Sequence, residues 1–177
     1  MSRVIQFLQG NGPDHKGRVL DDILKLDDQW WDECHDFIQW LFPLPKASNF
    51  FVGEDCPVIS FNDMVEMRTS IVIRGNLENS TEKFLKFLGF KLWIDKDGDY
   101  DITIAENFSE QANYWLRAND HNHLRINRML QCLILAKMEN LAKEIFCCLV
   151  MIKCEFADCI TDATMVYWRN ALTGYSY

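Results

Sequence analysis

The sequence predicts an all-α fold, a mostly helical single domain over residues 1–177 with at most one short β-hairpin near residues 90–104. Three observations support this prediction. A length of 177 residues is typical of one domain. Apolar residues recur at helical spacing along most of the chain, between residues that commonly start and stop helices. Hydrophobic residues make up 49% of the chain, enough for a core rich in Trp and Phe.

The N-terminal half is predicted to hold helices that are separated by turns and one long loop. Pro43 ends the second helix, because proline cannot extend a helix interior. Residues 44–59 carry Pro and Gly and are expected to form an irregular loop. Ser60 is a helix cap with an acid three residues later, and Gly89 is a typical helix stop. Helices are expected over Val19–Leu26, Gln29–Leu41 and Phe61–Arg74, the last resuming after a break at Gly75–Asn76.

The C-terminal half begins with the predicted hairpin. Both arms of "FKLWIDKDGDYDITIA" are rich in residues that favour strands, and they flank a turn at Asp97–Gly98. Further helices are expected near 106–117, 122–136, 139–156 and 162–172.

Composition and charge exclude several functions. A net charge of -8 disfavours a nucleic-acid partner, which requires a basic surface. The longest apolar run, Ile145–Ile152, is far shorter than the ~20 residues of a membrane span. The N-terminus does not resemble a signal peptide. Seven cysteines without a C-x-x-C pair indicate reduced thiols, so a cytoplasmic location is expected.

The stretch "HNHLRINRML", residues 121–130, contains two histidines and two arginines in ten residues that are otherwise spaced like a buried helix. On a helix capped by Asp120 or Asn122, His121, Arg125 and Arg128 share one face. One interpretation is a pocket wall, in which the arginines grip a carboxylate or phosphate and a histidine acts as a hydrogen-bond partner. The other, which we favour, is a structural clasp with neighbouring carboxylates. The candidate carboxylates are Asp32, Glu33 and Asp36.

Apolar residues on the same helix predict that Arg125 and Arg128 face inward, toward the "HDFIQW" helix and not toward bulk solvent. Buried arginine heads require a carboxylate, a carbonyl or a bound anion. A positive charge at a helix N-terminus is unfavourable, so we expect His121 and His123 to be neutral or balanced by an acid. The apolar surface comprises Leu124, Leu130, Leu133 and Ile134.

A second polar stretch, "HDFIQWLFPLP", covers residues 35–45. His35 and Gln39 lie four residues apart and would share a helix face. Trp40 beside them can present its indole N–H. This face is either the hydrated edge of a core helix or one wall of a groove whose other wall is the His121 helix.

The sequence contains two candidate cation sites, and neither is expected to bind a cation. His121 and His123 point in different directions on a helix, so they cannot share a metal ion there. Residues 95–106 match the spacing of a calcium-binding EF-hand loop except at its sixth position, where Tyr100 replaces the required glycine. We therefore expect an acidic solvent-exposed loop.

Taken together, four segments resemble the conserved region of the opioid growth factor receptor family. They are "HDFIQWLFPL" (35–44), "FLGFKL" (87–92), "HNHLRINRML" (121–130) and "TMVYWRNAL" (164–172), which recur in this order. The resemblance covers nearly the whole chain. It implies one compact, mostly helical domain and kinship with a receptor that binds a short opioid peptide.

The function expected from these observations is a non-enzymatic binding domain of this receptor-like family. Its partner would be a small peptide, a small anionic ligand or a partner protein, and we expect no cofactor, no metal and no catalytic residue. The alternative is a hydrolase in which His35 or His121 is the general base. The predicted ligand-binding residues are His35, Gln39, Trp40, His121, His123, Arg125 and Arg128.

Overall fold

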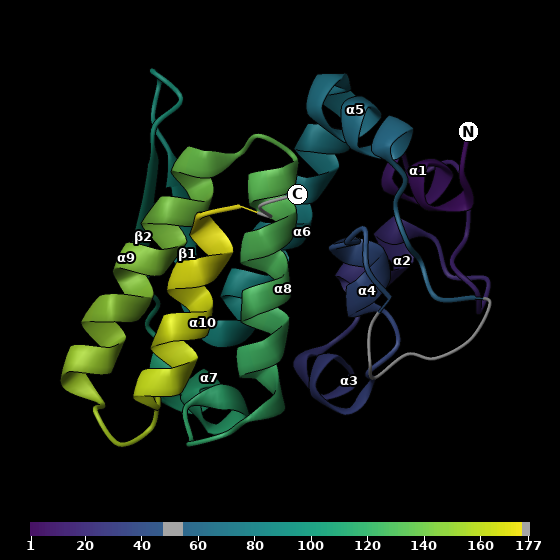
Figure 1. Ribbon diagram of the computed structural model, residues 1–177. Helices are drawn as coiled ribbons and strands as arrows, with labels where there is room; N and C mark the ends of the chain where they lie inside the picture. The colour runs from purple at the N-terminus through teal and green to yellow at the C-terminus, as the bar shows by residue number, and fades with distance from the viewer. Residues whose placement is uncertain (48–54, 175–177) are drawn as a thin grey trace. The chain divides into compact units, whose positions relative to one another are not determined.

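The computed structural model describes residues 1–47 and 55–174, which form ten helices and one two-stranded antiparallel hairpin (Figure 1). The predicted fold class is therefore confirmed. The chain divides into two compact units, an N-terminal unit of Met1–Thr81 and a C-terminal unit of Glu82–Tyr177. That the two together make one domain stays a prediction.

Short helices build the N-terminal unit around an aromatic core. The amphipathic helix α1 packs against α4 and α5. Trp31 and Phe37 meet edge to face with ring centroids 4.8 Å apart, and the Trp31 indole N–H donates to the carbonyl of Ile23. The elements are α1 (Arg3–Leu8), α2 (Leu20–Lys25), α3 (Asp28–Glu33), α4 (Ile38–Leu41), α5 (Phe61–Thr69) and the first part of α6 (Ile71–Leu88).

The single helix predicted over Gln29–Leu41 is wrong. The structure has α3 and α4 there, separated by an extended backbone at Cys34. Tertiary contacts outweigh the helical periodicity at this point. Asp36 accepts hydrogen bonds from Arg18 and Cys34, while Phe37 packs between Trp30 and Trp31. His35 lies in the connection, so it does not share a helix face with Gln39.

The predicted break at Gly75–Asn76 is also wrong, because α6 continues through it. The chain breaks earlier, at Ser70, whose hydroxyl accepts the N–H of Ile73. Asn76 donates to the carbonyl of Leu8, which fixes α6 to α1. The cap at Ser60 is confirmed, since Ser60 and Asp63 form a reciprocal capping box.

In the C-terminal unit, α8, α9 and α10 pack side by side and α7 lies against the start of α8 (Figure 1). The predicted helices are confirmed to within two residues at each end. Trp115 from α7 and Trp168 from α10 are fully buried in this core. The bounds are β1 (Phe90–Ile94), β2 (Tyr100–Ile104), α7 (Phe108–Trp115), α8 (His121–Leu135), α9 (Glu139–Glu155) and α10 (Asp162–Leu172).

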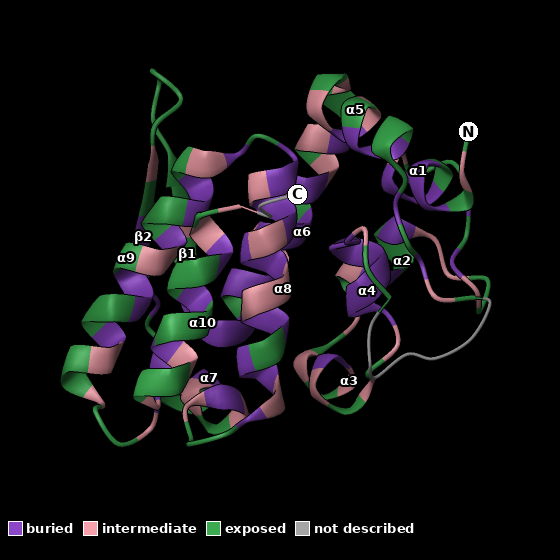
Figure 2. Ribbon diagram, in the orientation of Figure 1, coloured by how far each residue is buried: buried purple, intermediate pink, exposed green. Residues whose placement is uncertain are grey.

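The predicted hairpin is confirmed as β1 and β2, with Phe90 opposite Ile104 and Ile94 opposite Tyr100. Gly89 ends α6 with a left-handed φ of +88° and leads directly into β1. Helix α9 covers β2, while the turn between the strands is exposed (Figure 2).

Part of the loop predicted over residues 44–59, residues 48–54, lies outside the described residues. Near the two ends of the predicted loop, Leu44 and Val58 form an isolated parallel bridge. Within the described ranges, no helix is both long enough and apolar enough to cross a membrane. All seven cysteines belong to those ranges, and none forms a disulfide.

Candidate functional site

Two side chains of α4 each bury a polar atom that has no hydrogen-bond partner in the described part of the chain. Gln39 is 4% exposed and Trp40 is 2% exposed. Neither the side-chain carbonyl oxygen of Gln39 nor the indole N–H of Trp40 has a partner among the residues that the structure describes. Leaving a buried donor or acceptor unsatisfied costs about 1–3 kcal/mol. The two groups are adjacent in sequence, one an acceptor and the other a donor.

Cationic and aromatic groups surround Trp40. The imidazole of His15 stacks on the indole, with ring centroids 6.1 Å apart and an interplanar angle of 11°. The guanidinium carbon of Arg3 lies 5.3 Å from the ring centroid, a cation–π distance, and Phe7 meets the ring edge to face. Arg3 is exposed and forms an ion pair with Asp55 at 3.6 Å. An electropositive group therefore adjoins the unsatisfied indole.

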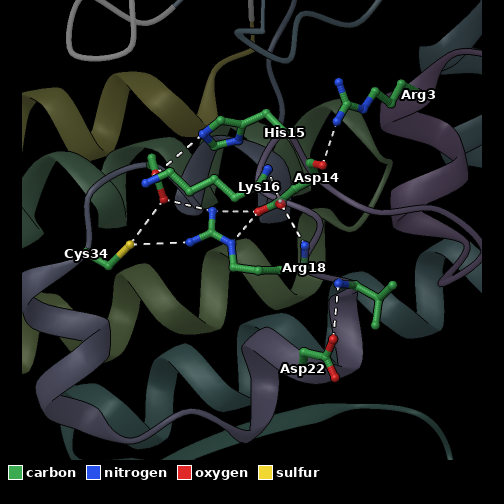
Figure 3. A network of polar contacts seen from close by, with 9 residues as sticks. Arg3, Asp14, His15, Lys16, Arg18, Asp22 and Cys34 are labelled. Carbon is green, nitrogen blue, oxygen red and sulfur yellow. Dashed lines mark hydrogen bonds and ion pairs between the residues drawn. The ribbon is translucent and has the colours of Figure 1, made fainter.

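A dense polar network, which we call the Asp14 network, holds His15 and its loop in place (Figure 3). Asp14 is fully buried, and its carboxylate accepts the backbone N–H groups of Lys16 and Arg18. The Arg18 guanidinium bridges Asp14 and Asp36 at 2.6 and 2.8 Å. Arg3 donates to the backbone carbonyl of Asp14 at 2.6 Å, so the same network also orients Arg3.

Asp36 is the second centre of the Asp14 network. Its carboxylate lies 2.7 Å from the ammonium of Lys16 and 3.5 Å from Nε2 of His15, and the thiol of Cys34 donates to it at 3.1 Å. Burial alone would raise the pKa of Asp36, but hydrogen bonds from Lys16, Arg18 and Cys34 hold this pKa well below its usual range. Asp36 is therefore an anion committed to partners within its own unit.

The start of α8 is a second polar cluster, built entirely within the C-terminal unit. Asp120 caps α8 by accepting the N–H of Asn122, and it also accepts from Arg117 at 2.6 Å. The Asn122 side chain donates to the carbonyl of Tyr114, and the guanidinium of Arg125 donates to Asn122 at 3.0 Å. These bonds join α8 to α7.

His123 connects three helices at this cluster. Its Nε2 lies 3.0 Å from the carbonyl of Trp115 on α7, and its own carbonyl accepts the indole N–H of Trp168 on α10. Because a carbonyl only accepts, Nε2 carries the proton of the neutral ring. Burial lowers the pKa of His123, although the nearby Asp120 opposes that shift. A neutral His123 agrees with the expectation at this helix N-terminus.

The seven predicted ligand-binding residues fall into the two units. The N-terminal unit holds His35, which is exposed, and the buried pair Gln39 and Trp40. The C-terminal unit holds the four from α8, of which His123 and Arg125 are buried and His121 and Arg128 are partly exposed. The groove predicted between the two sets stays a prediction.

Arg125 is 5% exposed and so does not face bulk solvent, as predicted, whereas Arg128 is partly exposed. That the two arginines face the segment 35–45 stays a prediction. Leu124, however, was assigned to the apolar surface and is 53% exposed. Asp36, one of the carboxylates expected to neutralise the α8 arginines, binds Lys16 and Arg18. Asn122 accepts from Arg125 in the cluster described above.

The two cation sites weighed from the sequence have the following geometry. His121 and His123 lie in the first turn of α8, and His121 Nδ1 is 3.5 Å from Asp120. In the 95–106 segment, one oxygen of Asp95 accepts the N–H groups of Asp97 and Asp99, which closes the turn. Across the described ranges, no group of three His, Cys, Asp or Glu side chains has a metal-binding arrangement.

Sequence patterns did not predict the residues that organise the N-terminal unit. Asp14, His15 and Arg18 belong to "GPDHKGR", which was read only as a turn, and Arg3 precedes the first apolar segment. The signal that could have identified them is an Asp followed by a basic run, because an Asp side chain commonly accepts the backbone N–H groups of the next residues in a turn. Their contacts with Asp36 and Trp40 could not be inferred from spacing.

Comparison with known proteins supports the resemblance seen in the motifs. Residues 16–173 match the protein family described as the opioid growth factor receptor (OGFr) conserved region. The chain is 31% identical to the opioid growth factor receptor of Rattus norvegicus over 123 residues, which are 66% of this chain and 20% of that protein. It is 32% identical to the opioid growth factor receptor-like protein 1 of Mus musculus over 120 residues, 66% of this chain and 24% of that protein.

A relative from Xenopus tropicalis, also an opioid growth factor receptor-like protein 1, is 30% identical over 121 residues, 66% of this chain and 22% of that protein. The chain thus spans less than a quarter of the length of these relatives. No solved structure matches the chain.

Proposed function

Because the chain belongs to the family of the opioid growth factor receptor conserved region, we propose that it is a non-enzymatic binding domain for a small peptide or a small anionic ligand. The name of the rat relative describes a receptor for opioid growth factor. The matched segment is only a fifth of that protein, so the same ligand is a proposal for this chain. The family supports a recognition role, and the ligand chemistry is argued from the side chains around α4.

The observation that carries the proposal is the unsatisfied pair on α4. Gln39 lacks a donor and Trp40 lacks an acceptor among the described residues. A peptide group carries one N–H donor and one carbonyl acceptor, so its chemistry complements both. Arg3, over the indole, adds attraction for a carboxylate. Since the chain itself covers both groups, a ligand reaches them only after a local opening around α4.

The other predicted contacts have different roles in this proposal. His35 is exposed beside α4 and is a peripheral contact. On α8, the partly exposed His121 and Arg128 are further proposed contacts, whereas His123 and Arg125 act by holding α8 against its neighbours.

The test follows the indole N–H resonance of Trp40 in the ¹⁵N-labelled chain during titration with opioid growth factor and, separately, with short acidic peptides. We expect a saturable shift of Trp40, because a ligand carbonyl or carboxylate would give it an acceptor. The Trp31 resonance is the internal control, since that indole already donates to Ile23.

Gln39→Leu separates recognition from folding. It removes a buried acceptor that has no donor among the described residues, so the melting temperature should be unchanged or higher. Binding should weaken at least about tenfold, equivalent to ~1.4 kcal/mol. Gln29→Leu on the exposed part of α3 is the matched control. An unmoved Trp40 resonance with every peptide, or wild-type affinity in Gln39→Leu, would refute the proposed function.

A further inference from the structure

The outer edge of β1 presents backbone groups that have no strand partner among residues 1–47 and 55–174. The bonds Asp95 N–H to Asp99 and Ala105 N–H to Gly89 set the phase of the ladder. In an antiparallel pair, hydrogen-bonded and non-hydrogen-bonded pairs alternate. The backbone groups of Phe90, Leu92 and Ile94 therefore point away from β2.

Nothing else in the described ranges pairs with that edge. The only strand neighbour of β1 is β2, and β2 is the strand that α9 covers. Phe90 is buried, but the distal part of β1 is open, with Trp93 57% exposed and Ile94 49% exposed. An open edge of this kind is a template for pairing with another extended chain.

Trp93 lies on the exposed face of the hairpin and is held in a defined position. Its indole N–H donates to the hydroxyl of Thr103 on β2 at 3.1 Å. Its direct cross-strand neighbour is Asp101, whose exposed carboxylate has no ion pair within the described residues. An exposed indole beside a carboxylate is a favourable surface for a lysine or arginine side chain.

The charge of the hairpin points to the same class of partner. Residues 91–106 contain five acidic and two basic side chains, a net charge of −3. One basic residue, Lys91, lies 3.5 Å from Glu106, and the acids of the turn remain exposed. Charge complementarity therefore favours a basic occupant over an acidic one.

From these observations we propose that the hairpin is a docking site for a basic extended peptide segment, which adds to β1 as a third strand. Backbone bonds to Leu92 and Ile94 supply pairing. Lysine or arginine side chains that alternate along the segment meet Trp93, Asp101 and the acidic turn. This surface is independent of the α4 site, and neither proposal requires the other.

The probe is a short synthetic peptide that alternates lysine and valine, titrated into the full ¹⁵N-labelled chain at low salt. We expect saturable shifts centred on the amides of Leu92 and Ile94 and on the Trp93 indole. The same peptide with glutamate in place of lysine should not bind. Added salt should weaken binding, since exposed charges are screened.

Backbone pairing is tested from both partners. Leu92→Pro removes an outward N–H while leaving the bonds to β2 in place, so it should weaken binding at least about tenfold. The Trp93 indole resonance reports whether the variant hairpin is intact. If it is not, the lysine peptide with N-methyl groups on its pairing amides gives the same test against the unmodified protein and should fail to bind.

The contribution of charge to binding is tested with a matched pair of variants. Asp101→Asn should weaken binding by roughly fivefold, and Asp158→Asn, an exposed acid in the α9–α10 connection, should leave it unchanged. The proposal is overturned if the N-methylated peptide binds as well as the parent peptide. It is also overturned if the glutamate peptide binds equally, or if the shifts centre on Ile102 and Ile104 of β2.

Discussion

At the scale of single residues, buried polar groups divide into those with built-in partners and those without. The ring Nε2 and the backbone carbonyl of His123 show the first kind, because Nε2 donates to Trp115 and the carbonyl accepts from Trp168. Nδ1 of the same ring is buried and has no partner among the described residues. Gln39 and Trp40 show the second kind. The sequence identified all three residues as candidates but could not separate them, because satisfaction depends on backbone carbonyls from other helices. A structural clasp and a binding site have the same residue composition.

His123 predicts how stability depends on pH. Burial places its folded pKa below the unfolded value of about 6.5. A depressed pKa gives stability that is complete above the unfolded pKa and is lost as pH falls toward the folded value. Between about pH 6.5 and that lower value, His123 should lower the free energy of unfolding by up to ~1.4 kcal/mol per pH unit.

Urea denaturation at a series of pH values measures this dependence. His123→Gln keeps a side-chain donor for Trp115 and removes the titration, so its stability should change less between pH 7 and the acid range than that of the wild-type chain. Gln29→Leu, an exposed substitution that removes no titrating group, is the control and should follow the wild-type profile. Identical profiles for wild type and His123→Gln would contradict the buried neutral state.

At the scale of elements, the sequence located most helices and the hairpin, and it failed where tertiary contacts decide a boundary. Local signals were sufficient at Ser60 and Asp120, since each caps its helix with its own side chain. They were insufficient at Cys34, where the break depends on Arg18 binding Asp36 from another segment. The helical spacing of apolar residues continues across that break, so periodicity alone indicated one helix.

Gly89, at the junction of α6 and β1, gives a prediction about element boundaries. A Cβ there would lie 2.9 Å from the ring of Phe108 and 3.0 Å from its backbone, in addition to the strain of a left-handed φ. Gly98, in the hairpin turn, has nearly the same φ of +86° but no atom within 4 Å of an added Cβ. Substitution of Gly98 therefore tests backbone strain alone, whereas substitution of Gly89 tests backbone strain together with steric crowding.

Gly98→Ala should cost about 1 kcal/mol, the strain contribution alone. Gly89→Ala should cost about 2–4 kcal/mol, because crowding against α7 adds to that strain. Thermal or chemical unfolding of the two variants beside the wild-type chain provides the comparison. Equal destabilisation would mean that the contact of Gly89 with Phe108 has no energetic weight.

At the scale of the whole molecule, each unit carries a different kind of core. The N-terminal unit relies on packed aromatic rings and on the Asp14 network, and the C-terminal unit relies on long amphipathic helices that bury Trp115 and Trp168. The core of the C-terminal unit could be predicted from the sequence, because its apolar residues recur at helical spacing. The core of the N-terminal unit could not be predicted, because short helices and turns contribute few residues each and their contacts join distant segments.

The cysteines of the chain report on its packing. Cys147 is exposed and its neighbour Cys148 is buried, although both belong to α9. Burial raises the pKa of Cys148 to about 11 and that of Cys132 to about 12, so both remain protonated and shielded at neutral pH. Iodoacetamide should therefore modify Cys147 and Cys154 first and reach Cys132 and Cys148 only when the chain unfolds.

Mass spectrometry of peptides after brief alkylation, with and without denaturant, measures these rates. All seven cysteines should react in denaturant, which controls for intrinsic reactivity. If Cys148 is modified as fast as Cys147 in the native chain, the orientation of α9 described here is incorrect.

Helix α1 lies outside the segment that matches the family, yet it packs into the core of the N-terminal unit. The part of the chain that matches the family begins at residue 16, yet Val4, Ile5, Phe7 and Leu8 of α1 are buried, and Asp14 anchors the loop that follows. A fragment trimmed to the shared segment would expose the faces of α4 and α5 that α1 covers and would deprive Arg18 of a carboxylate. The segment that matches the family is therefore shorter than the packed N-terminal unit, and residues outside that segment complete the hydrophobic core of the unit.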